Sequence, residues 1–235
     1  MTLSYKFMAI IKYLWFKLVS FGFHLLYHQL APTYDVVSWI VSFGKWQEWQ
    51  LAALPYIKGP DVLEVAHGPG HMLIALQASG HRVTGVDLSP QMGQLAIHRI
   101  RSGKKHVSLI RAPAQNLPIA SGSFDTVLAT FPTEFIAERA SLEEIKRVLR
   151  QNGRLIIVPQ AKLTGDSAVV RFLESLYTIT GQRNVPDEED AKNQHTKLFQ
   201  IMQQRFSDAG FNARMERVLQ PGSEVIVVIA TRKDK

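Results

Sequence analysis

Residues 61–71 read Asp-Val-Leu-Glu-Val-Ala-His-Gly-Pro-Gly-His, and this stretch decides the fold. It joins a short apolar run, typical of a buried strand, to a turn with two glycines from which a helix begins. In open α/β sheets, ligands bind at the carboxyl ends of strands, and glycine there lets backbone approach a ligand that a Cβ would exclude. Asp87 ends the next apolar run, nineteen residues after Gly68, with a carboxylate suited to ribose hydroxyls. The turn and the acid together predict a nucleoside-binding site; the alternative is a tight turn with an incidental aspartate.

Short apolar runs alternate with amphipathic segments on both sides of this stretch, which is typical of a mostly parallel sheet covered by helices. We expect strands near 61–66, 82–86, 106–110, 124–130 and 153–158, and helices near 70–79, 90–101, 139–150 and 196–209. Two final runs, 211–219 and 224–231, flank the turn-forming segment Gln220–Ser223 and predict an antiparallel hairpin. The predicted fold class is therefore α/β, with a seven-stranded, mostly parallel sheet and a terminal antiparallel hairpin.

The composition is that of one globular domain with peripheral additions. Of 235 residues, 46% are hydrophobic and 20% charged, which excludes wholesale disorder. No cysteine is present, which excludes disulfides and a thiolate metal site, so we expect no metal and a cytoplasmic location. The net charge of +7 is spread along the chain and is interrupted by the acidic cluster 187–190, which disfavours nucleic acid as a partner.

The N-terminal region differs from the rest of the chain. Residues 1–34 contain three lysines and no acid, and the segment Phe7–Tyr27 is mostly apolar or aromatic. As a helix it would carry a narrow polar stripe. A spanning helix is disfavoured because two lysines would lie in hydrocarbon at about 2.5–3.5 kcal/mol each near the centre. A signal peptide is disfavoured further, because lysines interrupt the apolar region and no small-x-small cleavage site follows it. An in-plane helix on the inner membrane face, a lid over the domain and a dimer contact stay open. We assign 1–54 to N-terminal amphipathic or lid helices and 55–235 to the main domain.

The glycine turn lacks the G-x-G-x-x-G spacing of dinucleotide sites. It resembles instead the Glu-x-Gly-x-Gly-x-Gly loop of class I S-adenosylmethionine-dependent methyltransferases, with Glu64, Gly68 and Gly70 matching and Ala66 in place of the first glycine. The likeness covers roughly 55–160 and continues through Val86–Met92, Asn116–Pro118, Ser123–Asp125 and Arg147–Leu149. It implies a Rossmann-like fold, S-adenosyl-L-methionine as cofactor and S-adenosyl-L-homocysteine as product.

The resemblance also implies which residues hold this cofactor. Asp87 would bind the ribose, with Leu88 beside the adenine, and Gln115 would reach the adenine amine because Pro113 stands where the family has a carboxylate. The full cofactor-binding set that we infer from the resemblance is Tyr34, Glu64, Ala66, His67, Gly68, Gly70, Asp87, Leu88, Met92, Ala114, Gln115 and Thr130.

A second resemblance, in the N-terminal region, is to the ubiquinone/menaquinone C-methyltransferases of the methyltransferase type 11 family. Their N-terminal motif is similar to Ala31–Asp35, followed by Ser42–Gly44 and Trp49, although Ser38 and Trp46 depart from it. The quinone-side segments of the family are replaced by Phe131–Phe135 and Pro159–Ala161. We therefore predict methyl transfer to a small lipophilic acceptor, such as a phospholipid amine or a polyketide-like phenol. Quinone C-methylation, RNA methylation and a catalytically silent binding module are the alternatives.

Methyl transfer from a sulfonium is an in-line displacement, so positioning supplies much of the rate. The candidates for a general base are His67, His71 and Glu134, which follow strands at the same edge of the predicted sheet. Each also has a structural interpretation: His67 contacts the backbone of its loop, His71 faces solvent from a helical first turn, and Glu134 favours the positive end of a helix. Residues 161–195 are expected to form a cap over the acceptor.

Overall fold

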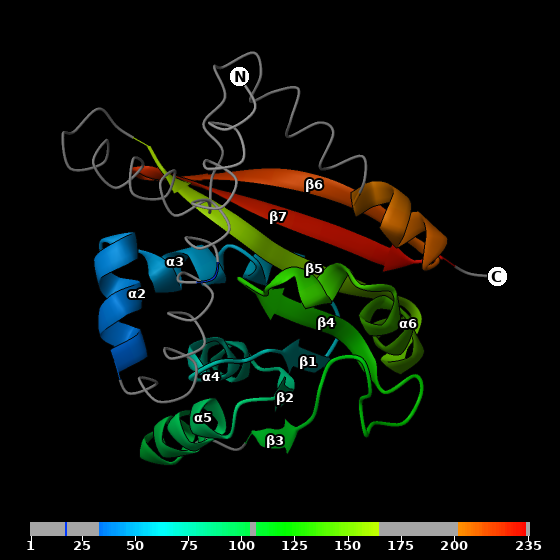
Figure 1. Ribbon diagram of the computed structural model, residues 1–235, viewed down its shortest axis with the longest axis horizontal. Helices are drawn as coiled ribbons and strands as arrows, with labels where there is room; N and C mark the ends of the chain where they lie inside the picture. The colour runs from blue at the N-terminus through cyan, green and yellow to red at the C-terminus, as the bar shows by residue number, and fades with distance from the viewer. Residues whose placement is uncertain (1–16, 18–32, 104–106, 165–201, 234–235) are drawn as a thin grey trace, which may run out of the picture.

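Seven strands form one sheet within the described part of the chain, which comprises Lys17 and residues 33–103, 107–164 and 202–233 of the computed structural model. Along the chain these strands are β1 (Asp61–Val65), β2 (Arg82–Asp87), β3 (Ser108–Arg111), β4 (Phe124–Thr130), β5 (Leu149–Leu163), β6 (Phe211–Gln220) and β7 (Ser223–Arg232). Their order across the sheet is β3-β2-β1-β4-β5-β7-β6 (Figure 1). The predicted N-terminal helix, Lys17 excepted, and most of the predicted cap lie outside the described residues.

The first five strands run parallel, and β7 pairs antiparallel with both β5 and β6. Strands β1, β2 and β3 follow one another outward, after which the chain crosses back to place β4 on the other side of β1. Such a reversal leaves a crevice at the carboxyl ends of the two inner strands, where open α/β sheets bind ligands. The predicted fold, including the terminal hairpin, is confirmed.

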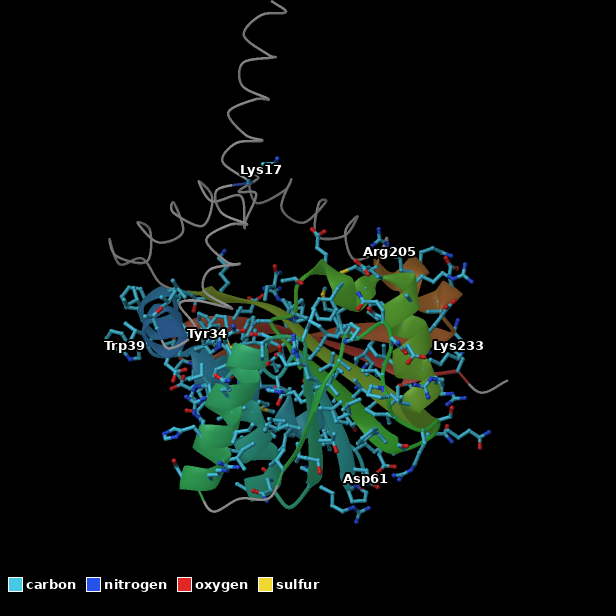
Figure 2. The ribbon with its side chains drawn as sticks, turned by 60° about the horizontal axis from the view of Figure 1, so that its bottom comes forward. Lys17, Tyr34, Trp39, Asp61, Arg205 and Lys233 are labelled. Atoms are coloured by element: carbon cyan, nitrogen blue, oxygen red, sulfur yellow. The ribbon has the colours of Figure 1, made fainter. Side chains whose placement is uncertain are left out.

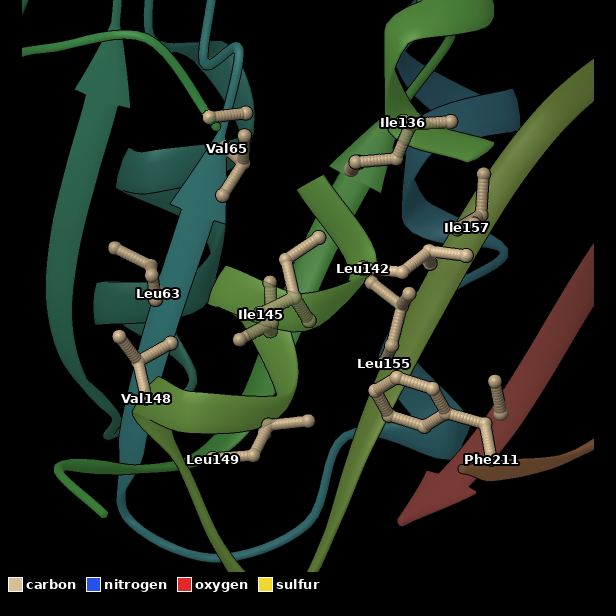
Figure 3. Close-up of a cluster of buried hydrophobic side chains, with 14 of the residues drawn as sticks. Leu63, Val65, Ile136, Leu142, Ile145, Val148, Leu149, Leu155, Ile157 and Phe211 are labelled. Carbon is tan, nitrogen blue, oxygen red and sulfur yellow. The ribbon is translucent and has the colours of Figure 1, made fainter. Parts of the chain in front are cut away.

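Helices cover both faces of this sheet. They are α2 (Tyr34–Ser42), α3 (Trp46–Leu51), α4 (His71–Ala78), α5 (Pro90–Ser102) and α6 (Arg139–Val148), with short 3-10 turns η2 (Leu54–Tyr56) and η3 (Glu134–Ala137) and helical residues 202–208. The period-two alternation of the strands divides the apolar side chains between two clusters. Leu63 and Val65 of β1 pack with α6 (Figure 3), whereas Val62 packs with α3 and α4.

Helix α3 belongs to the core of the domain. Trp49 is 3% exposed, and Ala52 and Ala53 beside it are also buried in the cluster that contains Val62. Residues before and after position 54, where we divided the N-terminal helices from the main domain, therefore pack into a common core. Among the described residues, no helix has both the length and the apolar character needed to cross a membrane.

Strand β5 is longer than predicted at both ends. Helix α6 ends at Val148, not at residue 150, because Leu149 already pairs with Phe124 of β4. At the other end the strand continues past Pro159, which cannot donate a ladder hydrogen bond, through an irregularity between Ile157 and Gln160. Residues 161–163, at the start of the segment that we assigned to the cap, are strand residues paired with β7.

Candidate functional site

The carboxyl ends of β1 and β2 lie side by side, because Val65 pairs with Val86 in parallel register. Just beyond them, the backbone N–H of Gly68 donates to Oδ2 of Asp87 at 2.9 Å. The N–H of Ser89 donates to the other carboxylate oxygen, Oδ1, at 2.8 Å. Asp87 is thus held against the glycine turn, as the sequence predicted. A carboxylate has about four acceptor sites, so two backbone donors leave acceptor capacity for further hydroxyl groups.

The turn itself is built from left-handed backbone conformations at Ala66, Gly68 and Gly70, with φ of 56°, 53° and 84°. A Cβ on Gly68 would meet nothing within 4 Å, so this glycine faces open space. A Cβ on Gly70 would lie 2.9 Å from the Cβ of Ala96, so that glycine permits α5 to pack closely. Ala66 stands where the methyltransferase loop has glycine, and an L-residue in this conformation costs about 1–2 kcal/mol.

Glu64 lies at the end of β1 and is fully buried. Neither carboxylate oxygen has a hydrogen-bond partner among the described residues. Burial raises the pKa of Glu64 well above its usual value, and the nearby charge of Asp87 raises it further. A buried carboxyl group without a partner is costly, so this position suits a ligand that brings a positive charge or hydrogen-bond donors.

His67 is buried in the turn, at 3% exposure. Its Nδ1 lies 2.7 Å from the carbonyl oxygen of Gly68, which only accepts, so Nδ1 donates there. Burial lowers the pKa of His67, although the charge of Asp87 works in the opposite direction. The ring packs against β2, where a Cβ on Gly85 would come within 2.9 Å of Cδ2. The imidazole is therefore fixed in one orientation and favours its neutral form.

Asp35 of α2 links three elements around the turn. Its Oδ1 is 2.8 Å from Nε2 of His71, the first residue of α4, and its Oδ2 accepts from Nη2 of Arg99 at 2.5 Å. Arg99 of α5 also donates through Nη1 to the carbonyl oxygen of Pro69. His71 is thus engaged with α2. Sequence reasoning did not identify Arg99, although its spacing from Met92 and Ala96 places it on the inner face of α5.

The residues expected near the adenine fall into two groups. Leu88 is 61% exposed and offers an apolar surface next to Asp87. Met92 is 1% exposed and packs in the interior, with its N–H on the Ser89 hydroxyl. Ala114 is buried, and the side-chain amide of Gln115 donates to Glu138 at 3.0 Å. The structure therefore exposes Leu88 beside Asp87 and buries Met92 in the interior.

The end of β4 forms the other wall. Glu64 pairs with Leu128, which places Ala66 level with Thr130. The hydroxyl of Thr130 accepts from Nε2 of Gln50 at 3.0 Å, an interaction that the sequence did not suggest. Oε1 of Gln50 and Nε1 of Trp49 are buried without a hydrogen-bond partner among the described residues.

Four aromatic rings gather at this wall. Trp46 packs 4.3 Å from Phe131, between ring centroids, with Trp49 and Tyr34 at 6.2 and 6.4 Å from Trp46. We call Tyr34, Trp46, Trp49 and Phe131 the aromatic cluster. Glu134 follows as the first residue of η3, and its side chain is exposed. The aromatic cluster gives the β4 side of the crevice an apolar character.

The sequence is similar to known methyltransferases over this part of the chain. A family model described as "Methyltransferase domain" matches residues 63–157. The ubiquinone/menaquinone biosynthesis C-methyltransferase UbiE of Geotalea uraniireducens is 30% identical over 154 residues, which are 61% of this chain and 66% of that protein. The demethylmenaquinone methyltransferase of Thermotoga maritima is 32% identical over 57% of this chain and 59% of its own length. The chain thus spans about three fifths of these curated relatives.

Solved structures share the fold. A putative S-adenosyl-L-methionine-dependent methyltransferase from Methanococcus maripaludis aligns with a TM-score of 0.62 at 17% identity, over 89% of this chain and 95% of that one. Phosphoethanolamine N-methyltransferase 2 of Haemonchus contortus, solved with S-adenosyl-L-methionine, aligns with a TM-score of 0.53 at 16% identity, over 81% and 53%. The strand order and the solved structures show a methyltransferase-like fold, residues 63–157 match the methyltransferase domain model, and the chain resembles the UbiE C-methyltransferases, which are S-adenosylmethionine-dependent enzymes of class I.

Proposed function

We propose that the chain transfers a methyl group from S-adenosyl-L-methionine to a small lipophilic acceptor. The observation that carries this proposal is the position of Asp87, which the N–H groups of Gly68 and Ser89 hold at the carboxyl ends of β1 and β2. A carboxylate fixed in this place is suited to the two hydroxyls of a ribose. The family match over 63–157 supports the same chemistry.

The residues present fit this cofactor. Asp87 would hold the ribose, Leu88 would cover one face of the adenine, and the open side of Gly68 leaves room for the chain of the methionine moiety. Glu64 would pair with the ammonium group, which would supply the partner that its buried carboxyl lacks. The bound cofactor supplies an electrophilic methyl group on a sulfonium, and the protein positions the acceptor in line with it.

The acceptor would lie on the β4 side. The aromatic cluster presents apolar rings there, which favours a lipophilic acceptor over a charged one. The neutral His67 is our first candidate for accepting a proton, through the ring nitrogen that does not face Gly68, with His71 and Glu134 as the other candidates.

Quinone C-methylation is the second candidate function. It is favoured by the UbiE and demethylmenaquinone methyltransferase relatives at about 30% identity. The segment that begins at Phe131 departs from the quinone enzymes, and here Phe131 closes the aromatic cluster against Trp46. A different lipophilic acceptor therefore remains our first proposal.

Transfer of a labelled methyl group distinguishes these acceptors. The full chain is incubated with methyl-labelled S-adenosyl-L-methionine and either vesicles of phosphatidylethanolamine, vesicles containing demethylmenaquinone, a phenolic polyketide or total RNA. We expect label in the organic phase, and label in a quinone would select the second candidate. Label in RNA alone would contradict the proposal, and so would a chain that binds the cofactor but labels none of the four.

A further inference from the structure

The buried face of helix α2 is polar and its exposed face is apolar, which is the reverse of a normal surface helix. Its inner face carries Ser38 and Ser42, which are 8% and 0% exposed. Its outer face carries the large apolar side chains Val36, Trp39, Ile40 and Phe43, which are 59%, 65%, 53% and 47% exposed. Val36, Trp39 and Ile40 follow the i, i+3, i+4 spacing of one helix face, and Phe43 is the left-handed C-cap residue that ends the helix; we call these four residues the α2 apolar face.

The inner face is firmly attached to the domain. The hydroxyl of Ser42 donates to the Ser38 carbonyl at 2.6 Å and accepts from the N–H of Trp46 at 3.0 Å, which joins α2 to α3. The carboxylate of Asp35 binds His71 and Arg99 next to the glycine turn. The orientation of α2 is thus fixed by polar contacts, and the α2 apolar face is directed outward. Figure 2 shows Trp39 at the edge of the molecule, pointing away from the sheet.

The size of this face argues against a second copy of the chain as its partner. Four side chains with these exposed fractions present roughly 400 Å² of apolar surface. A stable dimer buries about 800 Å² on each partner. An exposed apolar surface of this size, dominated by Trp and Phe, is instead sufficient for insertion at the boundary between lipid headgroups and acyl chains.

The charges near the face favour an anionic lipid surface. The only charged residue between positions 33 and 44 is Asp35, whose carboxylate is bound by Arg99 and His71. The preceding residues of the chain, 1–32, contain three lysines and no acid. Lysines near a membrane are attracted to anionic headgroups by about 1 kcal/mol each, so the charge of the sequence that precedes α2 favours an anionic surface, whereas an acidic sequence would be repelled.

We propose that the α2 apolar face inserts into the surface of an anionic membrane and so holds the acceptor crevice against the lipid. This proposal rests on the proposed function, in which the acceptor is lipophilic. Such an acceptor would then pass from the bilayer to the site without crossing water. Since Tyr34 on α2 contacts Trp46 of the aromatic cluster, the same helix joins the membrane contact to the acceptor wall.

Vesicle binding of the full chain tests this. Trp39→Ser/Ile40→Ser should weaken binding to vesicles of phosphatidylcholine with phosphatidylglycerol by at least about tenfold, because two large apolar side chains are lost. Met215→Ser on β6, where the side chain is 40% exposed, is the matched control and should bind as the native chain does. Equal binding by the double variant and the native chain would overturn the proposal.

Fluorescence locates Trp39 directly. The chain has four tryptophans, so the Trp39 signal is taken as the difference between the native chain and Trp39→Phe. We expect iodide to quench this signal in buffer, and acyl-brominated lipid to quench it in anionic vesicles. Absence of lipid quenching would overturn the proposal. Protection from iodide without vesicles would assign the face to another segment of this chain, and a native dimer that the double variant dissociates would assign it to a second copy.

The affinity for S-adenosyl-L-methionine separates this inference from the proposed function. The double variant should bind the cofactor as tightly as the native chain, because neither residue contacts the turn at Gly68. A native chain that inserts Trp39 into lipid but binds no cofactor would contradict the proposed function and leave the membrane contact standing. The reverse result would contradict only the membrane contact.

Discussion

Simple steric and electrostatic rules predict the positions of individual residues in the glycine turn. Gly68 and Asp87 were predicted from the sequence as a pair, and the structure joins them by a hydrogen bond of 2.9 Å. This was possible because Gly68 follows β1 and Asp87 ends β2, and these two strands are neighbours in a parallel sheet. Arg99 and Gln50 were not predicted. Their partners, Asp35 and Thr130, are distant in sequence, and the packing that brings them together leaves no local pattern.

Ala66 gives the first prediction at this scale. Its φ of 56° lies in the left-handed region, which glycine adopts without steric cost. Ala66→Gly should therefore stabilise the chain by up to about 1 kcal/mol, the steric gain being partly offset by the greater entropy of glycine in the unfolded chain. Urea unfolding measures the change. Gly80→Ala, at φ 89° with open space around its Cβ, should have the opposite sign; a destabilised Ala66→Gly variant would contradict the assigned backbone conformation.

Glu64 gives a prediction of pH dependence. Its pKa in the folded chain is raised well above the value of 4.5, so the folded state keeps a proton that the unfolded state loses. Without cofactor, the free energy of unfolding should therefore fall as the pH rises above about 4.5. Glu64→Gln, which resembles the protonated acid, should lack this contribution and be more stable than the native chain at neutral pH. Parallel pH profiles for the two proteins would show that Glu64 is not buried without a partner.

At the scale of helices and strands, the local sequence patterns were reliable where they were periodic. The hairpin was predicted because Pro221 and Gly222 suit a tight turn, and the two strands end on either side of them. The length of β5 was not predicted: the expected strand ended near residue 158, and the pairing with β7 carries it to Leu163. The orientation of α2 also escaped prediction. Its apolar positions suggest burial by their spacing, and only its neighbours show that the serine face is the buried one.

The amino ends of the strands carry an ion network that makes a prediction at this scale. Asp61 of β1 binds Arg82 of β2 at 2.6 Å and Arg150 of β5 at 2.8 Å, and Arg150 also binds Asp125 of β4 at 2.9 Å. The hydrogen bond from Arg82 is the main cause that lowers the pKa of Asp61 to about 2. Because Asp61 is the first residue of β1 and the glycine turn follows its last, this network lies at the opposite end of the strand from the turn; Figure 2 shows Asp61 at the lower edge of the molecule.

Asp61→Asn should therefore destabilise the chain at neutral pH. Folding lowers the pKa of Asp61 from 3.8 to about 2. The contribution of Asp61 to the free energy of unfolding is therefore present above about pH 4 and is lost as the pH falls toward 2. Unfolding by urea, measured for both proteins from pH 7 to pH 2, should show a difference that shrinks in this window. Cofactor affinity at pH 7 serves as the control, since it should be unchanged. A difference that persists at pH 2 would assign the effect to packing instead of charge.

At the scale of the whole molecule, the strand order places two different surfaces at one edge of the sheet. The polar groups of Glu64 and Asp87 end β1 and β2, and the aromatic cluster lies at the end of β4, on the other side of β1. A charged cofactor and an apolar acceptor would then meet between β1 and β4, where the strand order reverses. From its alternating pattern, the sequence predicted that the glycine turn and Asp87 lie at the carboxyl edge of the sheet. It could not predict the outward apolar face of α2, which depends on contacts between helices that are far apart along the chain.

The central claim is that Asp87 and the glycine turn bind S-adenosyl-L-methionine, and calorimetric titration of the native chain and Asp87→Asn measures this most directly. Asp208→Asn, whose carboxylate accepts from the side-chain amide of Gln204 in the helical residues 202–208, is the matched control. The native chain and the control should bind below about 1 mM, and Asp87→Asn should bind at least about tenfold more weakly, because a hydrogen bond to a charged group contributes about 1.5–3 kcal/mol. No binding by the native chain, or equal affinity for a folded Asp87→Asn variant, would contradict the account.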